Sequence, residues 1–125
     1  MSVNIKDNGN LVKGAGLYEV SYVNLSSLFP TDNDEHQIGE NLYIKRYTGT
    51  LASTQNTTAD ANFTHTLLGA YGTAGNGTDI YNIGAYFASN YFASVVKLSN
   101  ALTVCVGSAF YGGSYTIWAI YSKTS

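Results

Sequence analysis

Acidic, basic and histidine side chains are concentrated in one stretch of the chain, residues 32–46. The chain has six basic and eight acidic residues, and this stretch holds six of those charged side chains together with His36. The six are Asp32, Asp34, Glu35, Glu40, Lys45 and Arg46. Two carboxyl groups that flank a glycosidic bond can cleave it, one as an acid and the other as a base or nucleophile. A glycoside hydrolase site is therefore the first chemistry to consider.

The acids of this stretch lack the setting that such a site needs. They lie in a hydrophilic segment that leads into LYIKRY (residues 42–47), where Leu42 and Ile44 alternate with more polar residues. Carboxylates on a wet loop stay solvated, whereas a catalytic pair needs burial or a partner that separates the two pKa values. We therefore expect a solvated approach to a half-buried strand, with no catalytic residues and no enzymatic activity.

Other reactive side chains also lack a recognisable motif. His36 and His65 have no second His or Cys at metal-ligand spacing. His65 alternates with Phe63 and Leu67, a pattern that predicts a half-buried histidine. Cys105 is the single cysteine, and its segment LTVCVG is typical of a buried strand. The glycine-rich GTAGNG is not followed by the lysine-bearing helix of a phosphate loop. We expect no metal and no cofactor.

The composition excludes several classes of partner. Charged residues are 11% of the chain, aromatic residues are 14%, and the formal net charge is -2. Binding to nucleic acid or anionic lipid needs clustered Lys and Arg, which are missing here. No apolar run approaches the length of a membrane span or forms a signal peptide. We expect a soluble protein without membrane insertion, made in the cytoplasm of its host cell.

The segments alternate as β-strands and almost none has a helical pattern. Alternating Val, Ile, Thr and aromatic residues, bounded by Gly, Asn and Ser, predict strands. They fall at residues 17–23, 42–47, 62–68, 90–98, 101–107 and 114–124. Turns are expected at residues 71–79, 99–100 and 110–115. We predict an all-β fold, an antiparallel, jelly-roll-like β-sandwich of residues 31–125. Residues 1–30 are expected as an N-terminal arm or as extra strands, packed on this sandwich or on a neighbouring chain.

The last predicted strand is apolar on both faces. Tyr115, Ile117, Ala119 and Tyr121 line one face, and Trp118 and Ile120 line the other. Such a strand must be covered on both sides, because a large exposed apolar patch is a liability in a monomer. We favour an oligomer interface formed by Tyr115, Ile117, Trp118 and Ile120. The alternative is a central strand that lies under the N-terminal arm.

A surface rich in Tyr, Asn, Ser, Thr and Gly suits a binding function. Tyr provides a large, stiff contact, and the small polar residues provide hydrogen bonds on adaptable loops. Sugars match this composition, since their apolar faces stack on rings while their hydroxyls bond to amides. The densest such stretch is residues 70–91, with Tyr71, Asn76, Asp79, Tyr81 and Asn82 as ligand-binding candidates. The simpler interpretation of each is loop structure, with the tyrosines half in the core.

The charged stretch also carries a family resemblance. EHQIGENLYIKRYTGT (residues 35–50) resembles a pattern of phage tail fibre and tail-tip proteins, roughly E-x-x-(I/V)-G-x-W-x-x-G-K-P-(I/L)-Y-x-K-x-x-x-G. The matching positions are 35, 38, 39, 42, 43, 45 and 49. The chain end, YTIWAIYSKTS (115–125), is similar to the habitual finish of these domains. The Trp and the Gly-Lys-Pro turn of the usual pattern are missing, so we expect a different hairpin there.

The resemblance covers about residues 32–125 and implies a function. Similar domains are trimeric β-sandwich heads at the distal C-terminal end of tail fibres, and they bind bacterial surface receptors, often polysaccharides. It implies a homotrimer in the virion tail, with other tail proteins and a host-surface glycan or protein as partners. The pattern carries no catalytic residues. The alternatives are a structural phage protein without a ligand, such as a capsid decoration or fibre-assembly module, and a glycan-degrading enzyme or free lectin.

Overall fold

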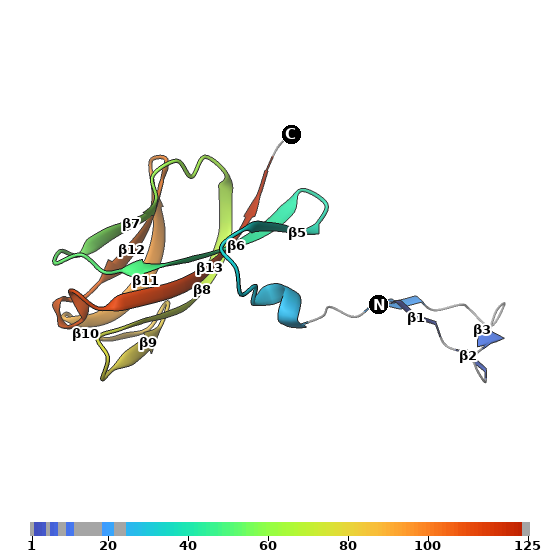
Figure 1. The fold of residues 1–125 in the computed structure, drawn as a ribbon, viewed down its shortest axis with the longest axis horizontal. Helices are drawn as coiled ribbons and strands as arrows, with labels where there is room; N and C mark the ends of the chain where they lie inside the picture. The colour runs from blue at the N-terminus through green and yellow to red at the C-terminus, as the bar shows by residue number, and fades with distance from the viewer. Residues whose placement is uncertain (1, 5, 8–9, 12–18, 22–24, 124–125) are drawn as a thin grey trace.

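The computed structural model describes residues 2–4, 6–7, 10–11, 19–21 and 25–123, with side chains from residue 25 onward. Two antiparallel sheets of five and four strands pack as a sandwich (Figure 1). The five-stranded sheet has the order β5 (Glu35–Gly39), β6 (Leu42–Thr50), β13 (Ser114–Ser122), β8 (Thr66–Gly75) and β9 (Ile80–Asn82). The four-stranded sheet has the order β10 (Tyr86–Ala88), β11 (Tyr91–Leu98), β12 (Ala101–Val106) and β7 (Asn56–Asp60). The prediction of an all-β antiparallel sandwich is confirmed.

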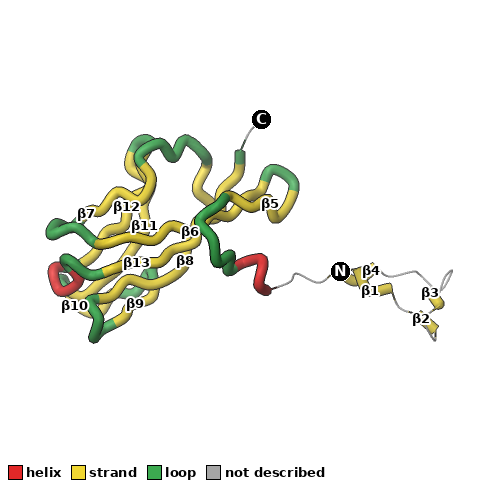
Figure 2. The backbone as a smooth tube through the Cα atoms, in the orientation of Figure 1, coloured by secondary structure: helices red, strands yellow, loops and turns green. Residues whose placement is uncertain are grey.

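Shorter elements precede and punctuate the sandwich. β1 (Ser2–Asn4) pairs with β4 (Glu19–Ser21), and β2 (Lys6–Asp7) pairs with β3 (Asn10–Leu11). The predicted strand at residues 17–23 is described only where β4 lies, and its other residues fall outside the described part of the chain. Two 3-10 turns, η1 (Leu25–Leu28) and η2 (Ser108–Phe110), are the helical elements among the described residues (Figure 2). None of the described helices has the length and apolar character to cross a membrane.

β13 occupies the centre of the larger sheet and organises the core. It pairs antiparallel with β6 on one side and with β8 on the other, and the register with β8 shifts between Ile120 and Tyr121. Tyr115, Ile117, Ala119 and Tyr121 alternate into the interior, where they are buried with apolar side chains of the facing β12. Burial of this apolar area is the main favourable term in holding the two sheets together.

Two turns follow the expected chemistry. Ser99 adopts a positive φ of 56° between β11 and β12, at the predicted hairpin of residues 99–100. Asn41 does the same between β5 and β6, with a φ of 56°. Asn is among the residues that enter this region at the lowest cost, which allows β5 and β6 to form a tight hairpin.

The loop predicted at residues 71–79 was placed too early in the chain. β8 continues through Tyr71 to Gly75, and the turn occupies the residues that follow. The Asn-Gly pair of the stretch, Asn76-Gly77, lies in this turn with a φ of 95° at Gly77, whereas Gly72 lies inside the strand with a φ of 133°. A Cβ atom at Gly72 would lie 2.1 Å from the carbonyl oxygen of Thr116, so the glycine permits close approach to β13.

Candidate functional site

Three aromatic rings meet on the outer face of the five-stranded sheet. Tyr71 of β8 and Trp118 of β13 are direct cross-strand partners, and their rings stack with centroids 5.8 Å apart. Phe29, which follows η1, stands edge-on to both rings, with centroids 5.5 Å from Tyr71 and 5.3 Å from Trp118. Edge-to-face and offset-stacked pairs of this kind are favourable beyond their area of contact. The outer face therefore carries a fixed aromatic surface.

The backbone of residues 28–30 fixes the polar ends of two of these rings. The Trp118 indole N–H donates a hydrogen bond to the Pro30 carbonyl oxygen over 3.0 Å. The Tyr71 hydroxyl donates to the Leu28 carbonyl oxygen, and burial raises the pKa of Tyr71. A raised pKa keeps this hydroxyl protonated, and therefore a donor, at neutral pH. The chain segment before the sandwich thus orients both rings.

A hollow of about 400 Å³ lies beside these rings. We call it the aromatic hollow, lined by Phe29, Tyr71, Gly72, Thr73, Asn82, Ile83 and Trp118. Its lining contains no ionisable acid, base or histidine, but it offers the Asn82 amide and the Thr73 hydroxyl next to the rings. Rings for stacking and neutral polar groups for orientation are the usual lining of a small-molecule site. Such a lining suits a neutral ligand that is apolar on one face and rich in hydroxyls at its edge.

Two of the five predicted ligand-binding residues belong to the aromatic hollow. These are Tyr71 and Asn82. Asn76 and Asp79 lie instead in the β8–β9 turn, where the Asn76 side chain accepts hydrogen bonds from the backbone N–H groups of Thr78 and Asp79. The Asn76 amide also donates to the Ala109 carbonyl oxygen over 3.0 Å. These contacts hold the turn, as in the simpler interpretation of the stretch.

Tyr81 lies on the opposite side of the sheet from the aromatic hollow. Its ring packs against Phe110 with centroids 4.9 Å apart and against Tyr91 with centroids 6.2 Å apart. It is half-buried against the core, which matches the expectation that some tyrosines of this stretch contribute to packing. Tyr81 therefore supports β9 from within the sandwich and does not line the aromatic hollow.

The four predicted interface residues are divided between the two faces of β13. Tyr115 and Ile117 are 7% and 0% exposed in the core, so they contact the facing sheet of the same chain. Trp118 and Ile120 alternate to the outer face and are half-buried. Phe29 packs on Trp118, so part of that face is covered by the segment that precedes the sandwich. This arrangement matches the alternative of a central strand that lies under the N-terminal arm.

Sequence patterns missed Phe29 and Trp118 as members of the aromatic hollow. Trp118 had a visible signal, because it is the only tryptophan of the chain and faces away from the core in a strand with period 2. Phe29 had none, since nothing in the segment LSSLFP indicates which strand it contacts. The contact joins positions 89 residues apart in sequence, which local patterns do not report.

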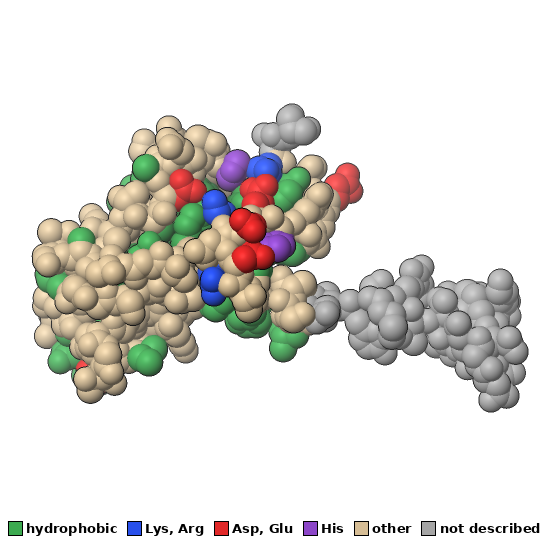
Figure 3. Space-filling model, viewed as in Figure 1, with side chains coloured by type: hydrophobic (Ala, Val, Ile, Leu, Met, Phe, Trp, Pro, Cys, Tyr) green, Lys and Arg blue, Asp and Glu red, His purple; other side chains and the backbone are tan. Residues whose placement is uncertain are grey.

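Charged and histidine side chains gather on one face of the sandwich (Figure 3), and those of the charged stretch lie on or next to β5 and β6. His36 lies 2.6 Å from the Asp32 carboxylate, and the Arg46 side chain donates to Asn33 over 2.8 Å. The hydrogen bond from His36 lowers the pKa of Asp32. Burial alone would raise the pKa of Glu35, but hydrogen bonds from Lys123 and Tyr121 outweigh it and lower that pKa.

The lowered pKa values of Asp32 and Glu35 do not match those expected for a general acid in a glycoside hydrolase site. A general acid at a glycosidic bond needs a raised pKa, whereas the pKa values of Asp32 and Glu35 are lowered by their partners. Both carboxylates are therefore held in the ionised form, Glu35 in an ion pair with Lys123 and Asp32 in a hydrogen bond with His36. No group of three or more metal-ligating side chains occurs among the residues that the structure describes.

Comparisons with protein-family models, with curated proteins and with solved structures found no match to this chain.

Proposed function

We propose that this chain is a bacteriophage tail or fibre protein that binds a host-surface glycan without cleaving it. The binding surface in this proposal is the aromatic hollow. The observation that carries the proposal is the combination of the Phe29, Tyr71 and Trp118 rings with the neutral polar groups of Thr73 and Asn82. A pyranose ring has an apolar face for stacking on an aromatic ring and hydroxyls for an amide.

Preorganisation supports the choice of this surface. The hydrogen bonds to the Leu28 and Pro30 carbonyl oxygens hold the Tyr71 and Trp118 rings in place before any ligand arrives. A ligand then orders few side chains on binding, which lowers the entropic cost. The same bonds occupy the polar ends of both rings, so a sugar would contact ring faces and edges, and its hydrogen bonds would come from Asn82 and Thr73.

The assignment to a phage tail rests on the resemblance of residues 35–50 and 115–125 to tail fibre and tail-tip domains. From it we propose a jelly-roll-like head that forms a homotrimer in the virion tail, beside other tail proteins. Ile120 is the predicted interface residue that stays on the outer face of β13 and does not line the aromatic hollow. Light scattering tests this part: three chains per particle are expected, and an Ile120→Arg variant should dissociate. A wild-type monomer would contradict the trimer.

Binding of the tagged protein to host cells and to an array of bacterial surface glycans tests the function. Trp118→Ala and Asn82→Ala should each weaken binding by about tenfold or more if the residues are central to the contact. Leu98→Ala is the matched control, because Leu98 is an exposed apolar residue of the other sheet. Circular dichroism checks that each variant is folded. Equal binding by all three variants, or adsorption to no host cell and no glycan, would refute the proposal.

A structural phage protein with no ligand is the second candidate, and one observation favours it. The donors of Tyr71 and Trp118 already bond within the chain, and Phe29 packs on both rings. The aromatic surface would then anchor the N-terminal segment and have no other role. In that case substitutions at Phe29 or Trp118 would lower stability, and Asn82→Ala, whose side chain is exposed, would change neither stability nor any binding.

A further inference from the structure

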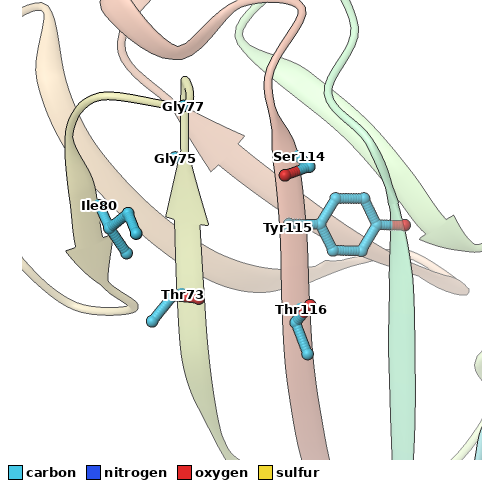
Figure 4. A pocket seen from close by; sticks show the side chains of 7 residues that line it. All are labelled: Thr73, Gly75, Gly77, Ile80, Ser114, Tyr115 and Thr116. Carbon is cyan, nitrogen blue, oxygen red and sulfur yellow. The ribbon is translucent and has the colours of Figure 1, made fainter.

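A second hollow lies on the same face of the sheet as the aromatic hollow, and Figure 4 shows the residues that line it. It has a volume of about 140 Å³ and lies over the ends of β8, β9 and β13. We call it the small-residue hollow, lined by Thr73, Gly75, Gly77, Ile80, Ser114, Tyr115 and Thr116. Thr73 belongs to both linings, so the two hollows meet at this residue.

The strand register makes the two hollows continuous. Across β8 and β13, Gly75 pairs with Ser114, Thr73 with Thr116 and Tyr71 with Trp118. Residues at i, i+2 and i+4 of a strand face the same side, so these three pairs form one row along the outer face. From Ser114 to Trp118 the row extends about 13 Å at the usual rise of a strand. β9 borders the row, with Asn82 beside Thr73 and Ile80 beside Gly75.

The side chains give this row the shape of a shallow groove. Its floor over the small-residue hollow is Gly, Ser and Thr, while the Tyr115 ring points away toward β6 (Figure 4). Ile80 is 69% exposed at one end of the groove, and Phe29 is 45% exposed at the other. An apolar side chain therefore stands at each end of a floor of small polar groups.

The linings of both hollows are free of ionisable acids, bases and histidines. An anionic sugar would lose hydration in this groove without gaining a cation in return, whereas a neutral sugar has no such cost. Charge and shape together therefore favour a neutral, extended ligand.

We propose that the two hollows form one groove for a linear, uncharged oligosaccharide of at least two sugar units. One unit stacks in the aromatic hollow, and the next lies over Thr116 and Ser114 against Ile80. This inference rests on the proposed function and adds to it the length and charge of the ligand. It also makes Ile80 a specificity-determining residue, because Ile80 contacts only the second unit.

Calorimetry with neutral and acidic bacterial surface oligosaccharides of one to four units tests the groove. For the wild type, two or more neutral units should bind about tenfold tighter than one, because the second hollow adds contact area. Acidic oligosaccharides of equal length should bind more weakly. Ile80→Ala should remove most of the gain with length and leave single-unit affinity unchanged. Because Ile80 is 69% exposed, its truncation removes little packing and the variant should fold as the wild type does. Leu98→Ala is the control on the other sheet.

The results of this experiment distinguish failure of the two-unit groove from failure of glycan binding as such. If single units bind and longer ones bind no tighter, or if Ile80→Ala weakens every length equally, the groove is refuted and the aromatic site stands. Preference for acidic oligosaccharides would also refute the groove. If no oligosaccharide binds, the proposed function fails and the groove fails with it.

Discussion

The Trp118 indole N–H donates to the Pro30 carbonyl oxygen over 3.0 Å, which joins the central strand of the larger sheet to the segment before the sandwich. The two residues are 88 positions apart in the sequence. The bond places Phe29 against the Trp118 ring, so one wall of the aromatic hollow comes from outside the sandwich strands. The stability of this segment and the shape of the hollow are therefore linked.

Trp118→Phe tests the hydrogen bond while retaining an aromatic ring. Loss of the donor leaves the Pro30 carbonyl oxygen without this partner, so the free energy of unfolding should fall by about 1 kcal/mol. Urea denaturation followed by circular dichroism measures the change. An unchanged free energy of unfolding would mean that water replaces the indole at no cost.

Phe29→Ala tests whether the segment before the sandwich contributes to binding. Truncation removes one wall of the aromatic hollow, so glycan affinity should fall by about fivefold or more, as for a ring at the centre of a contact. Leu25→Ala in the same segment is the matched control, because Leu25 is 67% exposed and does not line the hollow. Calorimetry compares the two variants. Equal affinities would exclude Phe29 from the site.

The predicted strand at residues 62–68 begins only at Thr66, the first residue of β8, whereas β11, β12 and β13 lie where their alternation predicted them. β13 shows why: the alternation of Tyr115, Ile117, Ala119 and Tyr121 places these residues in the core, as their period of 2 indicated. The same alternation leaves Trp118 on the outer face. It does not reveal what covers that face, because the cover is Phe29 in a distant segment.

The candidate site was only partly predictable, because contacts between strands decide which of its residues meet. Tyr71 and Asn82 were selected by composition, and register brings them to the same hollow. Tyr81 was selected with them, but adjacent residues of a strand point to opposite faces, so it packs inside the sandwich. Residues 71–75 were predicted as part of a glycine-rich loop, although Gly72 lies within β8. Its actual role, close approach to Thr116, depends on a neighbouring strand.

Gly72→Ala tests that role. A Cβ atom would lie 2.1 Å from the Thr116 carbonyl oxygen, and the φ of 133° is unfavourable for any residue with a side chain. The variant should lose about 2 kcal/mol or more of unfolding free energy through backbone strain and the displaced strand. Gly84→Ala is the control, since its φ is also positive but a Cβ there meets no atom within 4 Å. Chemical denaturation should show the larger loss at Gly72; equal losses would exclude the close approach as the cause.

Glu35 joins the start of β5 to the end of β13. Its carboxylate accepts hydrogen bonds from the Tyr121 hydroxyl and the Lys123 ammonium group. Burial raises the pKa of the Tyr121 hydroxyl, and the bond to Glu35 raises it further, so Tyr121 remains a donor at neutral pH. Both bonds are stronger to the ionised form of Glu35, and only that form makes an ion pair with Lys123, so we expect the stability of this end of the sheet to depend on pH.

Glu35→Gln should therefore change the pH dependence of stability in a defined direction. The pKa of Glu35 is lowered from its ordinary value of 4.5 in the folded state, so its contribution is fully present above that value and is lost as the pH falls through the folded-state pKa. At pH 7 the variant should be less stable by about 1–2 kcal/mol, and this difference should shrink on acidification. Urea titrations between pH 7 and pH 3 measure it. Glu40→Gln, exposed in the β5–β6 turn, is the control and should follow the wild type. A difference between Glu35→Gln and wild type that stays constant down to pH 3 would contradict the assigned role of the carboxylate.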